Sequence, residues 1–110
     1  MVFKLFEIDK HNKYAMNKQF IQLKFDVFCS NCELHPIYRV FVDDELITER
    51  KWRWEVPQIY LEEFIQLEVS SGRYQVRFES IPPGLITNTN GHVTQGPARL
   101  KNNSLLKVGE

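Results

Sequence analysis

The sequence predicts an all-β fold, in the form of a small β-sandwich or jelly-roll-like domain of about seven short antiparallel strands. Residues 37–79 contain successive runs in which apolar and polar side chains alternate with a period of two, and turn-forming residues separate these runs. No helical pattern alternates with the strands, as it would in a parallel α/β sheet. A hydrophobic content of 43% is enough for one core, so residues 1–110 are expected to form a single β domain. A partly open barrel of about five strands is the second architecture.

Two strands are predicted before residue 30. The first, Val2–Ile8, carries apolar residues on both faces and ends at the polar run Asp9–Lys13. The second extends from Phe20 to Phe28, where odd-numbered apolar residues alternate with polar ones. This alternation is typical of a strand with one buried and one solvated face.

A β-hairpin is predicted next. The alternating run Tyr38–Asp43 leads into the turn Asp43–Glu45, and a second alternating run extends from Leu46 to Glu55. Three consecutive carboxylates invite a calcium-site interpretation, but adjacent residues at a hairpin tip cannot all converge on one cation. A solvated turn is favoured, because aspartate at such turns satisfies local backbone groups.

Two further strands flank the turn at residues 70–72. Phe64–Val69 and Tyr74–Glu79 both alternate with a period of two. The segment Pro57–Phe64 has a helical alternative, because proline suits the first helical turn and the residues after it are spaced to meet on helix faces. One short helical turn near residues 57–64 is therefore the alternative to an extended segment.

Residues 84–110 are predicted to form a polar C-terminal hairpin or arm within the domain. Ile81–Gly84 interrupts the strand pattern, because its two prolines cannot donate to a β-ladder. Asn90 and Gly91 are a favoured two-residue turn between β-prone runs. Large aliphatic residues are sparse here, so an arm of this kind would be stable only when packed against another surface.

The net charge and the first seven residues indicate which partners and which site of synthesis to expect. The 14 Lys and Arg residues balance 14 Asp and Glu residues, so no overall field attracts nucleic acid or an anionic membrane. We expect neither as a partner, although a local basic patch is compatible with this balance. Residues 1–7 carry charges and no apolar run long enough for a signal peptide or a membrane span, so synthesis in the cytoplasm is expected.

Cys29 and Cys32 form a C-x-x-C motif, and His35 follows three residues later. Thiolates at this spacing can bind zinc, but a tetrahedral site needs four ligands and the sequence has no second cysteine pair. A redox role would place Cys29 at a helix N-terminus, whereas Leu34–Pro36 is a poor helical continuation. A turn with packed thiols is favoured over a metal site of Cys29, Cys32 and His35, and no cofactor is expected.

An aromatic platform is the second candidate site. Basic and aromatic residues interleave in Arg50–Trp54, as they do on surfaces that stack the bases of single-stranded nucleic acids. Strand alternation puts Trp52 and Trp54 on one face. There they are either core residues or, with Tyr60 and Tyr74, an apolar platform for sugar rings. A one-residue shift of register exchanges the two faces, so the sequence leaves this choice open.

No catalytic constellation is apparent. Nothing fixes the mutual distances of the acidic residues Glu62, Glu63, Glu68 and Glu79, and neither a Ser, His and Asp constellation nor a Gly-rich phosphate loop occurs. We therefore predict that the protein is not an enzyme.

Part of the chain resembles a known group of phage proteins. The segments Tyr38–Arg50, Tyr60–Glu63 and Gly72–Glu79, together with Trp54, resemble small uncharacterised β-rich proteins encoded by T4-like phages of marine cyanobacteria. The resemblance covers residues 37–80 and supplies no catalytic residues. It implies a small phage protein that is made in the cytoplasm of a bacterial host and points to a virion component.

The leading functional hypothesis is a non-enzymatic structural or interaction protein. As a phage virion component it would assemble with itself or bind another structural protein through edge strands or the C-terminal arm. The alternative is a carbohydrate-binding module that uses the aromatic platform, with a glycan as partner. A binder of single-stranded nucleic acid is the third hypothesis.

Overall fold

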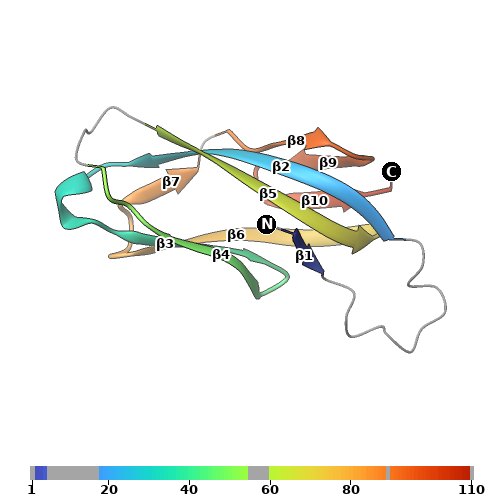
Figure 1. Cartoon of the computed structure of the whole chain (residues 1–110), viewed down its shortest axis with the longest axis horizontal. Helices are drawn as coiled ribbons and strands as arrows, with labels where there is room; N and C mark the ends of the chain where they lie inside the picture. The colour runs from blue at the N-terminus through green and yellow to red at the C-terminus, as the bar shows by residue number, and fades with distance from the viewer. Residues whose placement is uncertain (1, 5–17, 55–59, 89, 110) are drawn as a thin grey trace.

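The computed structural model describes residues 2–4, 18–54, 60–88 and 90–109, and these form two β-sheets that pack face to face (Figure 1). The strands are β1 Val2–Lys4, β2 Lys18–Cys29, β3 Ile37–Val42, β4 Glu45–Lys51, β5 Tyr60–Ser70, β6 Gly72–Ile81, β7 Ile86–Asn88, β8 His92–Gln95, β9 Ala98–Lys101 and β10 Leu105–Val108. One sheet, the β2–β5 sheet, has the order β1-β5-β2-β7, and β8 also pairs with β2. The other, the β3–β6 sheet, has the order β4-β3-β6-β10-β9. The predicted all-β class is therefore confirmed, with additional short strands near the C-terminus.

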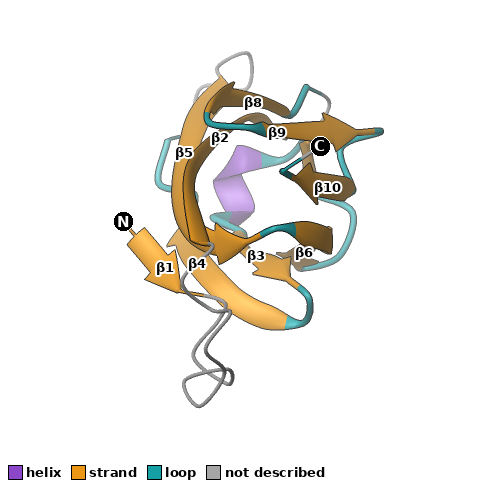
Figure 2. Ribbon diagram, turned by 90° about the vertical axis from the view of Figure 1, so that its right-hand side faces the viewer, coloured by secondary structure: helices purple, strands orange, loops and turns teal. Residues whose placement is uncertain are grey.

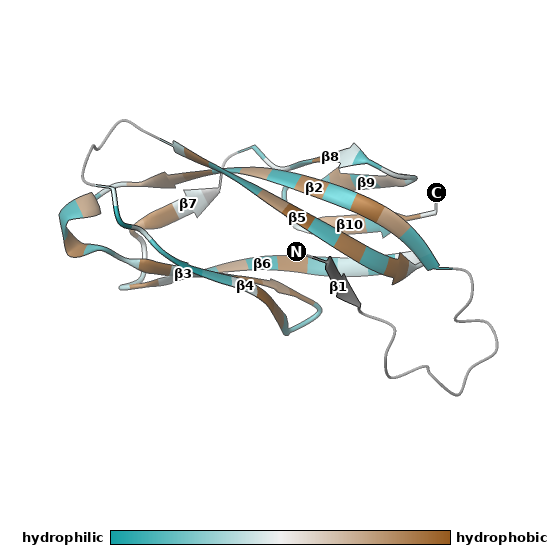
Figure 3. Ribbon diagram, in the orientation of Figure 1, coloured by the Kyte–Doolittle hydropathy of each residue, from teal (hydrophilic) through white to brown (hydrophobic). Residues whose placement is uncertain are grey.

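β2 and β5 are the longest strands, and they pair antiparallel from Lys18 opposite Ser70 to Phe28 opposite Tyr60. Odd-numbered residues on both strands face the other sheet and even-numbered residues face outward, apart from the strand ends. Figure 3 shows the resulting alternation of apolar and polar residues along these strands. The inward residues of the two strands that are fully buried are Ile21, Leu23, Phe25, Val27, Cys29, Ile65, Leu67 and Val69.

The predicted hairpin is formed by β3 and β4. Its turn residues Asp43 and Asp44 have φ angles of 49° and 66°, as a tight two-residue hairpin turn requires. Aspartate tolerates this region better than most residues, because its short side chain can bond to nearby backbone. Here the Asp43 carboxylate accepts a hydrogen bond of 2.7 Å from the backbone N–H of Gln75 on β6.

The chain passes from one sheet to the other between β5 and β6, as Figure 2 shows in end view. The hydroxyl of Tyr74 donates to the carbonyl oxygen of Ser70 at 2.8 Å and holds this corner. Between the sheets, the rings of Phe25 and Phe78 meet edge to face with centroids 5.0 Å apart. Aromatic rings of opposite sheets thus meet in a preferred geometry within the core.

The C-terminal segment differs from the expectation of a weakly apolar arm. β7 and β8 both pair with β2 and not with each other, so the predicted hairpin across Asn90 and Gly91 is wrong. β10 joins β6, and its residues Leu106 and Val108 are fully buried. The few aliphatic residues of this segment lie where the pleat points them inward, so the segment completes the core of both sheets.

The structure bears on two local expectations. Residues 60–64 belong to β5, so the alternative of a helical turn is not formed there, and residues 57–59 lie outside the described part. The outward and inward residues alternate from Tyr60 onward, and pairing with β2 satisfies the backbone of an extended strand. Within the predicted strand 2–8, β1 covers Val2–Lys4 and residues 5–8 lie outside the described part. Of the described residues, only Cys32–Leu34 are helical, as a short 3-10 helix (η3) in the predicted turn before β3.

Leu106 and its neighbour Leu105 provide a matched test of the C-terminal segment. The Leu106→Ala substitution should lower the free energy of unfolding by about 2–5 kcal/mol, because it removes methyl groups from a fully buried site. Leu105→Ala should cost less than about 1 kcal/mol, because its side chain is only half-buried on the outer face. Urea unfolding followed by circular dichroism measures both. Equal effects would contradict the burial of β10.

Candidate functional site

The four residues of the predicted aromatic platform do not share one surface. Tyr38, which faces the core, lies opposite Arg50, and this register turns Trp52 inward, where it is fully buried. Trp54 lies beyond the end of β4, 41% exposed, with its ring centroid 5.6 Å from that of Trp52. The two rings are therefore in contact, with Trp52 in the core and Trp54 at its exposed rim, as in the alternative in which the tryptophans are core residues.

The two tyrosines of the platform are also separated. Tyr74 faces inward, half-buried, with its hydroxyl bonded to Ser70. Tyr60 faces outward from β5 and its ring lies beside that of Phe28, with centroids 5.3 Å apart. Of the predicted platform, only Trp54 and Tyr60 are therefore on the surface.

The C-x-x-C motif lies in the turn at the end of β2. Cys29 and Cys32 are buried, no disulfide joins them, and the Cys32 thiol donates weakly to the Cys29 carbonyl oxygen at 3.6 Å. His35 is turned to the Trp52 carbonyl oxygen, 3.1 Å from its Nδ1. No group of three or more His, Cys, Asp or Glu side chains suited to a metal ion occurs among the described residues.

The thiols should be unreactive in the folded protein. Burial, together with a hydrogen bond with Cys32, raises the pKa of Cys29 from 9.0 to about 11. Near neutral pH this shift lowers the thiolate fraction about 100-fold, and the thiolate is the reactive form. A thiol-specific chromogenic disulfide reagent should label Cys29 at least this much more slowly than in the urea-unfolded chain. Labelling at the same rate in both states would contradict the packed turn.

A hollow of about 480 Å³ lies beside the β3–β4 turn. Its charged groups already bind one another. Arg77 lies 3.6 Å from Asp44 and stacks over the Phe41 ring at 4.2 Å, while Asp43 is bonded to the backbone of Gln75. These contacts stabilise the hairpin tip, and they agree with the interpretation of Asp43–Glu45 as a solvated turn.

Glu63 on β5 is the one buried charged side chain of the described residues, with 4% of its surface exposed. It accepts a hydrogen bond of 2.5 Å from the Tyr38 hydroxyl on β3. The Arg50 guanidinium on β4 donates to both carboxylate oxygens, at 2.9 and 3.2 Å. All three side chains are engaged, and they join the two sheets. The sequence signal for this network is an acidic residue at an inward position of the strand, between Leu61 and Ile65.

The Tyr38→Phe substitution tests this network through the pH dependence of stability. Burial and the Glu63 carboxylate raise the pKa of Tyr38 far above its usual value near 10. The pKa of Tyr38 is higher in the folded than in the unfolded state. The contribution of Tyr38 to the free energy of unfolding is therefore complete below pH 10 and is lost as the pH rises above 10. Wild-type stability should therefore fall by about 1.4 kcal/mol per pH unit above pH 10 through this group.

In the Tyr38→Phe variant, the loss of stability above pH 10 that is due to Tyr38 should be absent. At pH 7 the variant should be about 1–2 kcal/mol less stable, because Glu63 loses a hydrogen bond. Urea unfolding at a series of pH values measures both effects. An identical alkaline decline in the two proteins would contradict a protonated, buried Tyr38.

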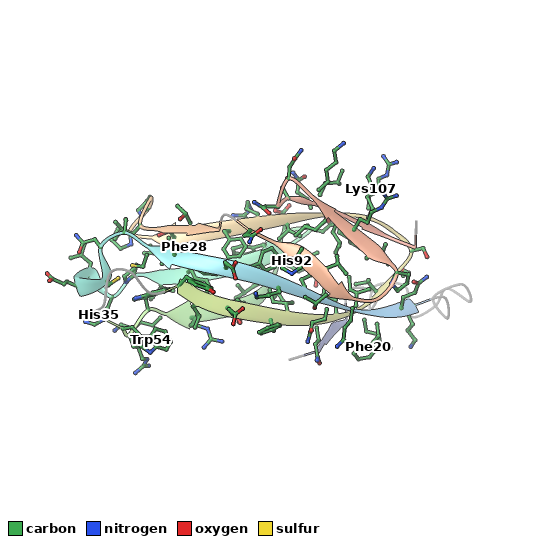
Figure 4. All side chains as sticks on the ribbon, turned by 90° about the horizontal axis from the view of Figure 1, so that it is seen from above. Phe20, Phe28, His35, Trp54, His92 and Lys107 are labelled. Carbon is green, nitrogen blue, oxygen red and sulfur yellow. The ribbon has the colours of Figure 1, made fainter. Side chains whose placement is uncertain are left out.

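The outward side of β2 and β5 carries four exposed aromatic residues, which we call the aromatic face: Phe20, Phe28, Tyr60 and Phe64. Phe28 pairs with Tyr60 across the two strands, Phe64 lies opposite Lys24, and Phe20 lies opposite Glu68. The rings occur at alternate rows of the outward face along the paired strands. Figure 4 labels Phe20 and Phe28, which lie near the two ends of β2.

Polar side chains separate the rings of the aromatic face, and most of them bind one another. Lys24 forms ion pairs with Glu62 and, at 3.5 Å, with Asp26. The hydrogen bond with Glu62 raises the pKa of Lys24, so this cation stays charged. At one side of the face, the Thr94 hydroxyl of β8 donates to the Gln22 side chain at 2.8 Å. The polar groups of the face are thus largely satisfied within the molecule.

Comparisons with known proteins add no relative. No protein-family model, no curated protein and no solved structure matches the chain. In the described part of the chain, no helix is long and apolar enough to cross a membrane.

Proposed function

We propose that the protein is a non-enzymatic structural protein that associates with a second copy of itself through the aromatic face. The observation that carries the proposal is the row of exposed rings on β2 and β5, the two central and longest strands of their sheet. Exposed aromatic residues are rare on a solvated sheet face and are enriched at the centres of protein interfaces.

The size of the aromatic face fits an interface. With about 200 Å² for each aromatic side chain, exposed fractions of 57%, 37%, 47% and 48% for Phe20, Phe28, Tyr60 and Phe64 leave roughly 400 Å² of exposed ring surface. A standard interface buries about 800 Å² on each partner, of which a little over half is apolar. The four rings would supply most of that apolar share.

The charges between the rings favour a second copy as the partner. The face contains the cations Lys18 and Lys24 together with the anions Asp26, Glu62 and Glu68, so neither sign dominates it. A two-fold interface brings a surface against itself, and a surface of one sign would then repel its copy. The mixed signs here permit such a contact.

The carbohydrate hypothesis is less well supported than it was from the sequence. Trp52 and Tyr74 face inward, and three of the four exposed rings on β2 and β5 are phenylalanines without a polar group. Specific sites also need polar groups that fix the ligand's orientation. On this face those groups already bind one another, which favours an apolar protein contact.

The resemblance of residues 37–80 to phage-encoded proteins supports a virion, assembled in the cytoplasm of a bacterial host, as the setting of this association. A compact all-β domain is suited to such a role. The proposal does not depend on the identity of the phage.

Phe64→Ser tests the proposal. Phe64 lies near the middle of the aromatic face, where a buried aromatic side chain contributes about 1–2 kcal/mol or more, so self-association should weaken about 10-fold or more. Light scattering coupled to size exclusion, over a range of protein concentrations, should show a dimer for the wild type and a monomer for the variant at equal concentration. Because Phe64 is exposed, the free energy of unfolding of the monomer should change by less than about 0.5–1 kcal/mol.

Leu46→Ser and Leu34→Ser are matched controls. Both leucines are exposed to a similar degree, 45% and 57%, but they lie away from the aromatic face, on β4 and η3. Neither substitution should change the mass of the wild-type dimer. A wild-type protein that is monomeric at every concentration, or a control that dissociates as readily as Phe64→Ser, would overturn the proposal.

A further inference from the structure

Four cations gather on the outer face of the β3–β6 sheet, far from the aromatic face. Lys107 on β10 lies directly opposite Arg73 on β6 and Arg99 on β9, so these three form a row across adjacent strands. Lys101 lies in the next outward row of β9. We call these residues the basic cluster. Figure 4 shows Lys107 pointing away from the sandwich among other nitrogen-tipped side chains.

The basic cluster also surrounds a hollow. Arg99, Leu100, Lys101 and Lys107 line an open depression of about 360 Å³ on the surface of β9 and β10. Directly opposed side chains in a sheet are about 5 Å apart, so like charges there repel each other. Three cations around one depression therefore reduce the stability of the empty protein and favour occupation by anions.

The rest of this sheet's outer face is arranged differently. Arg39 binds Glu49 and Glu79, and Arg77 lies within ion-pair distance of Asp44 and Glu79. By contrast, no carboxylate of the described residues forms an ion pair with Arg99, Lys101 or Lys107. Arg99, Lys101 and Lys107 thus gather around one depression without an ion-pair partner among the described residues.

We infer that the basic cluster is a binding site for the phosphate backbone of double-stranded nucleic acid. A row of cations matches a linear polyanion, and a nucleic-acid strand carries one negative charge for about every 3.4 Å of its axis. Arginine adds a planar donor group that can bind a phosphate through two hydrogen bonds. No exposed aromatic residue lies in the cluster, so base stacking contributes nothing and the binding is independent of sequence.

An anionic membrane is the competing occupant. Peripheral proteins that bind membranes through basic residues usually insert apolar side chains as well. Leu105, the apolar neighbour of Lys107 and Lys101 on this face, is half-buried and does not protrude. The lack of a protruding apolar side chain therefore favours nucleic acid.

The salt dependence of binding is the sharpest readout. We would titrate the full chain into a fluorescein-labelled DNA duplex of arbitrary sequence and follow the anisotropy. Neutralisation of three phosphates by Arg99, Lys101 and Lys107, the three cations that line the depression, predicts a slope of about −2.7 for log K against log salt concentration. This slope is about a 40-fold loss of affinity from 50 to 200 mM salt. In the Lys101→Gln/Lys107→Gln variant the slope should fall by about 2, to near −1.

Lys51→Gln/Arg53→Gln is the matched control. It removes two exposed cations from the end of β4 and the residues after it, where the sequence interleaves basic and aromatic residues. Its affinity and slope should equal those of the wild type. The Phe64→Ser variant should also retain binding, so that this inference and the proposed self-association fail separately.

Three results would overturn the inference. The first is a wild-type protein that does not bind the duplex at 50 mM salt. The second is an equal loss of binding in the control and cluster variants. The third is binding to phosphatidylcholine vesicles that contain phosphatidylserine without binding to the duplex, which would assign the cluster to a membrane surface. Duplex binding that weakens with salt and is lost only in the Lys101→Gln/Lys107→Gln variant supports the inference.

Discussion

The carboxylate of Glu63 is the constraint on which the packing of the two sheets depends. An unpaired charge at this depth would cost several kcal/mol, so the sheets are stable together only where β5 brings Glu63 to Tyr38 and Arg50 of the opposite sheet. Aliphatic side chains tolerate small displacements, whereas hydrogen bonds weaken as their distances and angles change. This contact between the sheets therefore fixes how β5 sits on β3 and β4, and with it which residues of β5 must face outward.

The alternation of side chains along the pleated strands then determines which residues face outward. With Glu63 and its odd-numbered neighbours inside, Tyr60 and Phe64 must lie outside, and pairing with β2 adds Phe20 and Phe28 to the same face. The basic cluster lies on the opposite sheet. Pairing of two copies through the aromatic face would consequently leave both basic clusters on the outside of the dimer. A structural protein of this form could hold a polyanion on either side without competition between the two contacts.

Much of the fold was predictable because period-two patterns between residues 20 and 79 are governed by local pleating. The turn at Asp43–Glu45 and the turn after Cys29 were predictable for the same reason. The C-terminal segment was not, since its sparse leucines and valines are buried only through pairing with β2 and β6, which lie far away in the sequence. Residue identity alone could not show that pairing.

The sites were harder to predict than the fold. Trp52 and Trp54 were candidates by residue type, but both lie just beyond the end of β4, where Trp52 is buried and only Trp54 is exposed. The aromatic face was implicit in the even-numbered residues of β2 and β5 and could have been found by asking which large apolar residues alternation leaves outside. The basic cluster combines β6, β9 and β10, so it required the sheet order.

Hydroxyl-radical footprinting of the wild-type protein at low and high concentration tests the central claim most directly, because it reports the accessibility of individual rings. The account predicts that Phe20, Phe28, Tyr60 and Phe64 lose reactivity together as the concentration rises, while the exposed Leu34, Leu46 and Trp54 keep theirs. Unchanged reactivity of all four rings at a concentration where the protein is an oligomer would contradict it, because association would then use a different surface.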